Sequence, residues 1–272
     1  MIDFSDPFRQ RLTADQRQAL LREDEQWVGK AFDVQANPRA IQANTRHLTL
    51  ILLDTKLELR ASRAAQFAEQ LMDAIMYEYA KSPIACSKGC SHCCTTYVSA
   101  TIPEILNLAN TVRRTFIRRE RVLSAAEQCK ATPQLYREVK RVICPMLENH
   151  ACSEYANRPV SCRYLLSKSL ETCVKILQRG EEAEFQYTDN VVVIRSFIII
   201  MMKAALEMVG LPQQHYELNQ ALAVAMTTED AEARWLAGEP LFASVDVDRN
   251  DTGTSHLHGM ASHLAKLLAP TI

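Results

Sequence analysis

The sequence predicts an all-α, mainly helical protein with irregular cysteine-rich loops. Glycine is scarce, with 7 residues in 272, whereas average usage would give about 19. Good helix formers such as Ala, Leu, Glu, Gln and Arg are common, and turn signals are few. No run of alternating polar and apolar residues indicates a strand. A chain of this length buries a sizeable core, in one large domain or two small ones.

Composition also excludes several functions. The seven glycines are too far apart to form GxGxxG or a Walker A loop, which excludes a standard Rossmann dinucleotide site and a standard P-loop. The 31 Lys and Arg residues nearly balance the 32 Asp and Glu residues, so the net charge is −1. Because no overall field attracts polyanions or anionic lipids, we expect no nucleic-acid partner and no membrane association.

The cysteines and the N-terminus indicate the compartment. Nine cysteines in a chain of this size are too few for a disulfide scaffold, and MIDFSDPFRQ is not a basic-then-apolar leader. We therefore expect a cytoplasmic protein, because clustered thiols in a reducing compartment serve as metal ligands or redox groups. The most apolar stretch, 191–209, contains Arg195, Lys203 and Glu207. It is predicted to be a buried helix rather than a membrane span.

The N-terminal region, 1–83, is expected to be helical. Residues 1–35 form a polar helical lead-in, and a long helical pattern extends from about 40 to 81. Its apolar residues recur at alternating spacings of four and three, which places them on one stripe. The stripe consists of Leu57, Ala61, Ala64, Ala68, Leu71 and Ile75. The pair Ser82-Pro83 ends this helix, because a residue before proline is displaced from the α region.

The central region, 84–180, contains all nine cysteines, of which Cys129 and Cys173 are expected on helical stretches and the others in loops. Thr101 and Glu104 have the spacing of a capping box, so an amphipathic helix is expected to begin there. A short helix carries Cys173 and ends near Gly180.

The C-terminal region, 181–272, is again predicted to be helical. Its apolar helix at 190–209 ends at Gly210, and Pro212 follows, which is a strong stop signal. Three further helices are expected at about 213–226, 229–237 and 255–269.

Eight of the nine cysteines fall into two groups of four. The first cysteine group has the spacing C-x3-C-x2-C-C and consists of Cys86, Cys90, Cys93 and Cys94. The second cysteine group has the spacing C-x7-C-x9-C-x10-C and consists of Cys144, Cys152, Cys162 and Cys173. Cys129 lies outside both groups on a helical stretch and is expected to be a packed thiol.

These thiols predict a metal site. Soft thiolates select zinc, copper(I) or iron–sulfur clusters, and eight of them allow two centres, or one cluster with spare thiols. The adjacent side chains of Cys93 and Cys94 tend to diverge. We therefore expect ligands to cross between the two groups, with Cys93 and Cys94 at different centres or only one of them bound to metal.

The spacing favours an iron–sulfur cluster, with zinc as the alternative. Structural zinc sites usually contain paired C-x2–4-C knuckles, and only the segment from Cys90 to Cys93 has that form. Three closely spaced cysteines with a remote fourth are common in iron–sulfur proteins, as is a Cys-Pro pair such as Cys144-Pro145. A third interpretation, buried thiols without metal, is disfavoured by the density of the first group. CxxxCxxC is also the radical S-adenosylmethionine signature, but Cys94, the scarcity of glycine and the lack of repeating strand–helix units argue against that class.

The central region resembles the YkgJ-type cysteine-cluster family, which is described as a zinc- or iron-chelating domain. The resemblance rests on CSKGCSHCC followed by CPMLENHACSEYANRPVSCR and covers about 84–175. After CxxxCxxCC, the matching positions are Cys144-Pro145, Leu147, Cys152, Tyr155, Arg158-Pro159, Cys162-Arg163 and Cys173. It implies that all eight cysteines of the two groups are metal ligands.

The same family includes flagellin lysine N-methylases, in which the cysteine cluster is thought to hold an iron–sulfur centre. The resemblance therefore implies an alternative function, a protein-modifying methyltransferase that acts on a protein substrate. No separate catalytic motif is found, and the usual glycine-rich loop for S-adenosylmethionine is absent. Whether the chain is an enzyme stays open at this point.

Each of four further residues near the cysteines has two alternative interpretations. Glu104 is either a carboxylate near the metal or the capping partner of Thr101, and we expect the cap. Arg158 and Arg163 either donate hydrogen bonds to cluster sulfurs or offset the negative charge of several thiolates, or else Arg158-Pro159 is a rigid turn with a solvated arginine. The flanking cysteines favour the first role. His92 lies inside the first group, but eight thiols suffice without it.

Residues 111–142 are locally basic, with nine Lys and Arg against three Glu. Five arginines form one face, namely Arg113, Arg114, Arg118, Arg119 and Arg121. We expect a solvated helix face that meets the acidic segment 229–251, because no aromatic platform for nucleic acid accompanies it. The histidines of the C-terminal tail, His256, His258 and His263, are expected at the surface.

These observations predict a cytoplasmic metal-binding protein. The eight cysteines hold an iron–sulfur cluster, zinc, or both, and the protein serves as a structural or redox module that acts with a protein partner.

Overall fold

The computed structural model describes residues 12–87, 89–113, 116–136, 141–251 and 255–272. About 58% of the described residues are helical and about 4% are in strands, which confirms the mainly all-α class. The α-helices are α1 (Ala14–Asp24), α2 (Pro38–Leu53), α3 (Arg60–Tyr79), α4 (Ile102–Val112), α5 (Phe116–Lys130), α7 (Val160–Arg163), α8 (Leu170–Val174), α9 (Val191–Met208), α10 (Leu218–Thr227), α11 (Ala231–Leu236) and α12 (His256–Leu268). Shorter helical turns are η1 (His92–Thr95), η2 (Gln134–Tyr136), η3 (Tyr155–Asn157), η4 (Lys175–Arg179) and η5 (Ala269–Thr271).

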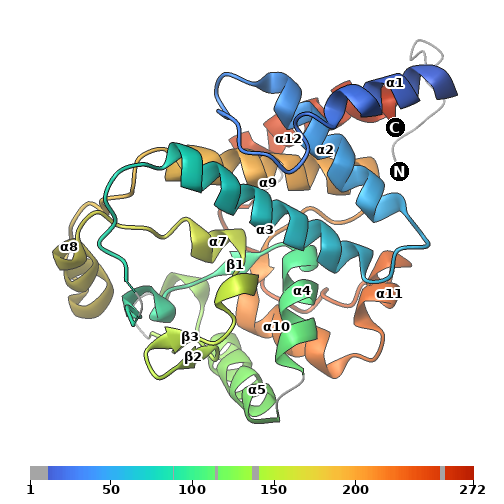
Figure 1. Cartoon of the computed structure of the whole chain (residues 1–272). Coiled ribbons are helices and arrows are strands. Elements are labelled where there is room, and N and C mark those ends of the chain that lie inside the picture. The colour runs from blue at the N-terminus through green and yellow to red at the C-terminus, as the bar shows by residue number, and fades with distance from the viewer. Residues whose placement is uncertain (1–11, 88, 114–115, 137–140, 252–254) are drawn as a thin grey trace.

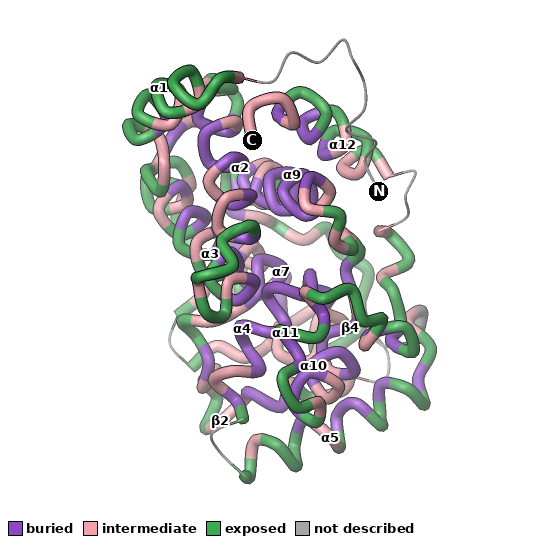
Figure 2. Tube along the Cα trace, turned by 90° about the vertical axis from the view of Figure 1, so that its right-hand side faces the viewer, coloured by how far each residue is buried: buried purple, intermediate pink, exposed green. Residues whose placement is uncertain are grey.

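The helices pack in a continuous series around the apolar helix α9 (Figure 1). Helix α9 contacts α2 and α12, helix α3 bridges α2 and α4, and α10 covers α4 and α5. Most of α9 is buried because these neighbours cover it on several sides (Figure 2). Lys203 is among its buried residues. Within the described part of the chain, no helix is both long and apolar enough to cross a membrane.

The long helical pattern predicted at 40–81 is interrupted, so the expectation of one helix is wrong. Helix α2 ends at Leu53 and α3 begins at Arg60. Between them the Asp54 carboxylate accepts the backbone N–H of Lys56 at 3.0 Å, and Leu59 is left-handed with φ 53°. An aspartate that bonds the backbone locally competes with helical hydrogen bonds. The stripe itself is correct within α3, where its five members are buried.

The expected helix ends are largely confirmed. Helix α3 ends at Tyr79, shortly before Ser82-Pro83, and Gly210 follows α9 with φ 73°. The last helix, α12, lies within the expected 255–269.

Two short antiparallel pairs were not expected from the sequence. Strand β1 (Ser99–Ala100) pairs with β4 (Tyr216–Glu217), and β2 (Leu147–Glu148) pairs with β3 (Ala151–Cys152). The β2–β3 turn consists of Asn149 and His150, both with positive φ, 49° and 60°, as a tight two-residue hairpin requires. Two-residue strands are too short to show a period of two, which explains why the sequence pattern missed them.

Candidate metal centre

The eight grouped cysteines lie on connections and short elements rather than on the long helices. The first group occupies the connection between α3 and β1, with Cys93 and Cys94 inside η1. Of the second group, Cys144 precedes β2, Cys152 ends β3, Cys162 lies on α7 and Cys173 on α8. None of these eight cysteines forms a disulfide.

Four cysteines gather around the β2–β3 hairpin, and we call them the hairpin cluster. They are Cys94, Cys144, Cys152 and Cys162. The backbone N–H of Cys144 donates to the carbonyl of Cys94 at 2.7 Å, which joins the first group to the second. Burial raises the pKa of Cys144 to about 11, and the neighbouring Cys152 thiolate adds to the rise. Burial also raises the pKa of Cys162, which lies within range of the charges of Cys144 and Cys152.

Three cysteines form a second gathering, the loop cluster, consisting of Cys86, Cys90 and Cys173. Ser167, which is fully buried, connects two of them. Its backbone hydrogen-bonds to the thiol of Cys86, and its hydroxyl contacts the thiol of Cys173. Its carbonyl also accepts the N–H of Ala85 at 2.7 Å. The charges of Cys90 and Cys173 both raise the pKa of Cys86, although burial raises it more.

Cys93 lies between the two clusters. A hydrogen bond from the Cys94 thiol lowers the pKa of Cys93 to about 7, against the effect of burial. The same bond raises the pKa of Cys94. Cys93 is within electrostatic range of Cys144 and Cys162 on one side and of Cys86 and Cys173 on the other.

Backbone N–H groups point at sulfurs of the hairpin cluster. Met146 and Leu147 donate to the thiol of Cys144, and Glu154 donates to that of Cys152. Hydrogen bonds to sulfur orient and tune metal-bound thiolates. Across the described ranges, however, no three or more His, Cys, Asp or Glu side chains are placed to hold one metal ion. The sulfurs are thus close enough to raise one another's pKa, but they are not placed as the ligands of one metal ion are.

The two arginines of the motif have different roles. The Arg158 guanidinium lowers the pKa of Cys93, Cys152 and Cys162 and lies 3.6 Å from the centre of the Tyr155 ring. It is therefore close enough to offset thiolate charge, as expected. The Arg163 side chain is 3% exposed and instead forms an ion pair with acidic residues of α3.

Glu104 is the capping partner that the sequence predicts. Its Oε2 accepts the backbone N–H of Thr101 at 2.8 Å and the Thr101 hydroxyl at 2.6 Å. Its Oε1 accepts the N–H of Val160 at 2.8 Å. Because Val160 begins α7, this one carboxylate fixes the start of α4 and the short helix that carries Cys162.

The basic face of α5 meets the hairpin rather than segment 229–251, so the expected partner was wrong. Arg118 bonds the carboxylates of Glu154 at 2.6 Å and Glu148 at 3.2 Å, and Arg121 bonds Glu148 at 3.3 Å. Arg113 donates to the carbonyl of Ala225. Arg114 lies outside the described residues, and Arg119 is exposed. The hairpin brings its two glutamates beside α5, an arrangement that linear charge patterns cannot reveal.

The remaining candidates lie apart from the clusters. Cys129 is buried on α5, where the amide of Asn219 donates to its sulfur at 3.4 Å. His92 is in η1, beside Cys93. On α12, His256 and His263 are exposed as expected, and His258 is half-buried.

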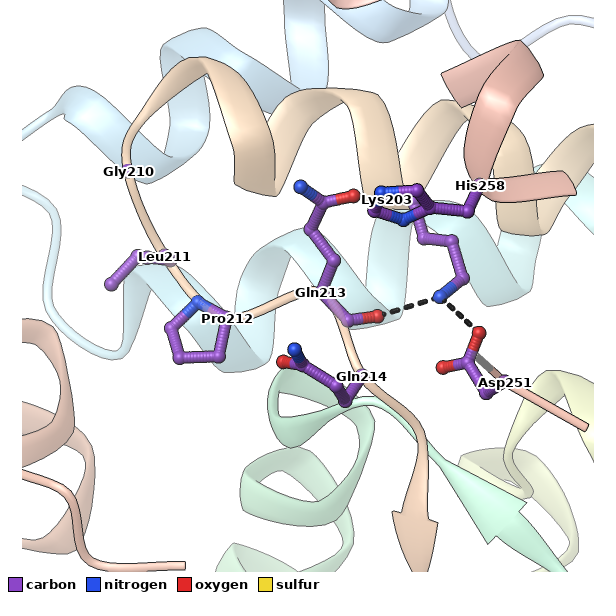
Figure 3. Close-up of a pocket in the computed structure, with 8 residues that line it drawn as sticks. All are labelled: Lys203, Gly210, Leu211, Pro212, Gln213, Gln214, Asp251 and His258. Atoms are coloured by element: carbon purple, nitrogen blue, oxygen red, sulfur yellow. Dashed lines mark hydrogen bonds and ion pairs between the residues drawn. The ribbon is translucent and has the colours of Figure 1, made fainter. Parts of the chain in front are cut away.

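A polar cavity of about 370 Å³ lies between the end of α9 and α12 (Figure 3). Lys203 donates there to the carbonyl of Gln213 at 2.8 Å and to Asp251 at 2.5 Å. Asp251 also accepts from the backbone and ring of His215. This network fixes the connection before α12 and lies apart from both cysteine clusters.

A buried carboxyl group beneath α7 was missed by sequence reasoning. Glu69 is 1% exposed and contacts Arg163 at 3.5 Å and the amide of Asn107 at 3.2 Å. Burial, with the neighbouring charge of Glu104, raises the pKa of Glu69 to about 8 despite Arg163. The signal was its position, four residues after Ala65 and three before Met72, on the buried stripe of α3.

Glu69 should make stability depend on pH. Its pKa is raised in the folded state, so the native protein binds more protons than the unfolded chain between pH 4.5 and about 8. The free energy of unfolding should therefore fall as the pH rises through this window. We expect Glu69→Gln to reduce that fall by about 2 kcal/mol, measured by urea denaturation at pH 5.5 and 8.5. Equal slopes in both proteins would contradict a raised pKa.

Comparison with known proteins identifies no relative. No family model matches the chain, and neither a curated protein nor a solved structure matches it. The resemblance to the YkgJ-type family therefore stays a prediction.

Proposed function

We propose that this chain is a metal-binding protein whose eight grouped cysteines hold an iron–sulfur cluster, zinc, or both. The ligands would be Cys86, Cys90, Cys93, Cys94, Cys144, Cys152, Cys162 and Cys173. The observation that carries the proposal is the convergence of two cysteine groups that are distant in sequence. The backbone hydrogen bond from the N–H of Cys144 to the carbonyl of Cys94 links one group to the other. The contacts of Ser167 with the thiols of Cys86 and Cys173 provide a second link.

The chemistry of the donor set supports a soft metal. Eight grouped thiols could supply four ligands to each of two centres, as zinc and iron–sulfur clusters require. Neighbouring thiolates repel one another, as the raised pKa values of Cys86 and Cys144 indicate. Bound metal would offset this repulsion. The Arg158 guanidinium adds positive charge at the same place. The spacing of the first group with a remote fourth cysteine favours iron–sulfur.

The role that fits this arrangement is a structural or redox module of the cytoplasm that works with a protein partner. Bound metal would tie the α3–β1 connection to the hairpin, α7 and α8, segments with little secondary structure of their own. Such a centre contributes folding free energy where the site is not formed in advance.

Anaerobic purification tests the proposal. We expect brown protein with a broad visible absorption band, bound iron and a matching amount of acid-labile sulfide, measured per chain by metal analysis and a sulfide assay. Colourless protein with stoichiometric zinc and no sulfide would establish the zinc alternative. Wild-type protein that contains neither metal, even after anaerobic reconstitution with iron and sulfide or with zinc, would refute the function. The variant with serine at all four cysteines of the second group is the control for adventitious metal.

A further inference from the structure

We infer that the polar cavity between the end of α9 and α12 binds a small zwitterion, a free α-amino acid, at one molecule per chain. The inference goes beyond the proposed function and does not depend on the cysteines. It rests on a buried cation, a carboxylate, an amide oxygen without a donor and an imidazole around one space of about 370 Å³. Small-molecule sites are typically cavities of roughly 300–1,000 Å³ with a few converging polar groups.

Lys203 is the buried cation of this cavity. It is 2% exposed and lies on α9, where the other buried residues are all apolar. An ammonium group has three N–H donors, and those of Lys203 reach the carbonyl of Gln213 at 2.8 Å and the Asp251 carboxylate at 2.5 Å. Among the described residues no third acceptor bonds it, so one donor remains for a molecule in the cavity. Because a buried ion pair is weak evidence for stability, its place beside a cavity favours a binding role.

Gln213 supplies the amide oxygen that has no donor. Its side-chain nitrogen donates to Glu207 at 3.1 Å, which fixes the orientation of the amide. Its Oε1 is buried, and no group in the described part of the chain donates to it. Figure 3 shows this amide directed toward His258 and Lys203, which line the same cavity. A buried acceptor without a donor is costly, so a ligand that carries N–H groups would be favoured here.

Asp251 and His258 complete the polar lining. The Asp251 carboxylate accepts from Lys203 and from the backbone and ring of His215, and a carboxylate can accept about four hydrogen bonds. His258 is half-buried and contributes an imidazole. The cavity therefore offers acceptors at Asp251 and Gln213, which suit an ammonium group. It offers donors at Lys203 and His258, which suit a carboxylate.

The balance of charge favours a zwitterion over a simple ion. Lys203 and Asp251 neutralise each other in their ion pair, so together they attract neither a plain anion nor a plain cation. A plain carboxylate would lie near Asp251 and leave the Oε1 of Gln213 without a donor, and a plain amine would lie near Lys203. A free α-amino acid carries both groups on one carbon atom, and its size suits the volume of the cavity.

Binding measurements on the full wild-type chain test the inference. Each of the twenty common L-amino acids is offered singly at millimolar concentration, first by ligand-observed NMR and then by calorimetric titration. We expect at least one to saturate a single site per chain with a Kd below about 1 mM. The matched carboxylate without the amino group, and the matched amine without the carboxylate, should each bind at least about tenfold more weakly.

Two glutamine variants locate the bound amino acid. Gln213→Leu removes the buried acceptor and should weaken binding about tenfold. Gln214→Leu is the matched control, because Gln214 lines the same cavity with an exposed side chain, and its affinity should stay within about twofold of wild type. Lys203→Met should weaken binding at least as much as Gln213→Leu. If Lys203→Met does not fold, His258→Ala replaces it, because His258 is only half-buried.

Several results would overturn the inference. One is the absence of binding by any of the twenty amino acids. Another is equal binding of the matched carboxylate, the matched amine or glycerol, because the cavity would then be a site for a simple ion or a polyol. Unchanged affinity in Gln213→Leu and in the second variant would place the bound amino acid elsewhere. None of these measurements reports metal content, so failure here is distinguishable from failure of the proposed function.

Discussion

Replacing Arg163 with methionine is expected to lower the free energy of unfolding by about 3 kcal/mol at pH 8. The guanidinium is 3% exposed and bonds Glu69 at 3.5 Å, Asp73, and the carbonyls of Arg158 at 2.7 Å and Ala156 at 2.5 Å. Methionine fills similar volume but leaves the carbonyls of Arg158 and Ala156 without their donor and removes the cation that pairs with Glu69, which is about half ionised at pH 8. Breaking a buried network in this way costs more than its single bonds contribute.

The pH should alter this cost. Arg163 lowers the pKa of Glu69, which nevertheless lies at about 8, so without the arginine the carboxyl takes up a proton more readily. At pH 6 the buried carboxyl is neutral in both proteins, so the wild type has no Glu69–Arg163 ion pair to lose and the loss should be smaller than at pH 8. Asp73 is half exposed and can be solvated, so it adds little. Urea denaturation at both pH values measures the difference.

Arg158→Met is the matched control, because Arg158 belongs to the same motif but is less buried. It should change the free energy of unfolding by about 1 kcal/mol or less. A loss below 1 kcal/mol for Arg163→Met at pH 8 would show that the Glu69–Arg163 pair does not support α7.

The helical class could be predicted from the sequence because its signals are local. The scarcity of glycine, the stripe that ends at Ile75 and the stop at Gly210 each report on a few neighbouring residues. The break between α2 and α3 depends on one side chain, Asp54, that bonds the backbone instead of solvent. Patterns of apolar residues do not register such a bond.

Which cysteines meet in the candidate site could not be predicted from the sequence. Spacing predicts which cysteines are available, but which thiols meet depends on a hairpin of two-residue strands and on a left-handed turn at Asn149 and His150. Ser167 carries no sequence signal, although its buried position joins Cys86 to Cys173. The adjacency of Cys93 and Cys94 predicts diverging side chains, but in the structure the two thiols are hydrogen-bonded to each other, so that premise is wrong.

A second large effect is expected when Cys93→Ala and Cys129→Ala are compared. Both changes remove one sulfur from a helical segment, and neither introduces a new polar group. Cys129 is buried on α5 and accepts a hydrogen bond from Asn219 at 3.4 Å, so its loss should cost only packing, on the order of 1 kcal/mol. Metal content per chain should stay at the wild-type value.

Cys93→Ala should behave differently, because Cys93 lies between the two clusters. If the proposed function is correct, loss of this thiolate removes one of the eight ligands, and we expect metal content per chain to fall to about half or less. Structural metal can contribute roughly 10–16 kcal/mol to a site that is not formed in advance. The α3–β1 connection and α8 should therefore become sensitive to protease.

The two variants should be prepared side by side and analysed for metal per chain and for proteolysis. Equal depletion in both would show that Cys129 is a ligand and that four-plus-four membership is wrong. Unchanged metal in both would remove Cys93 from the proposed ligand set. Depletion in Cys93→Ala alone is the expected result, because Cys93 is hydrogen-bonded to the Cys94 thiol and its charge raises the pKa of both Cys86 and Cys144, whereas Cys129 lies apart from the grouped cysteines.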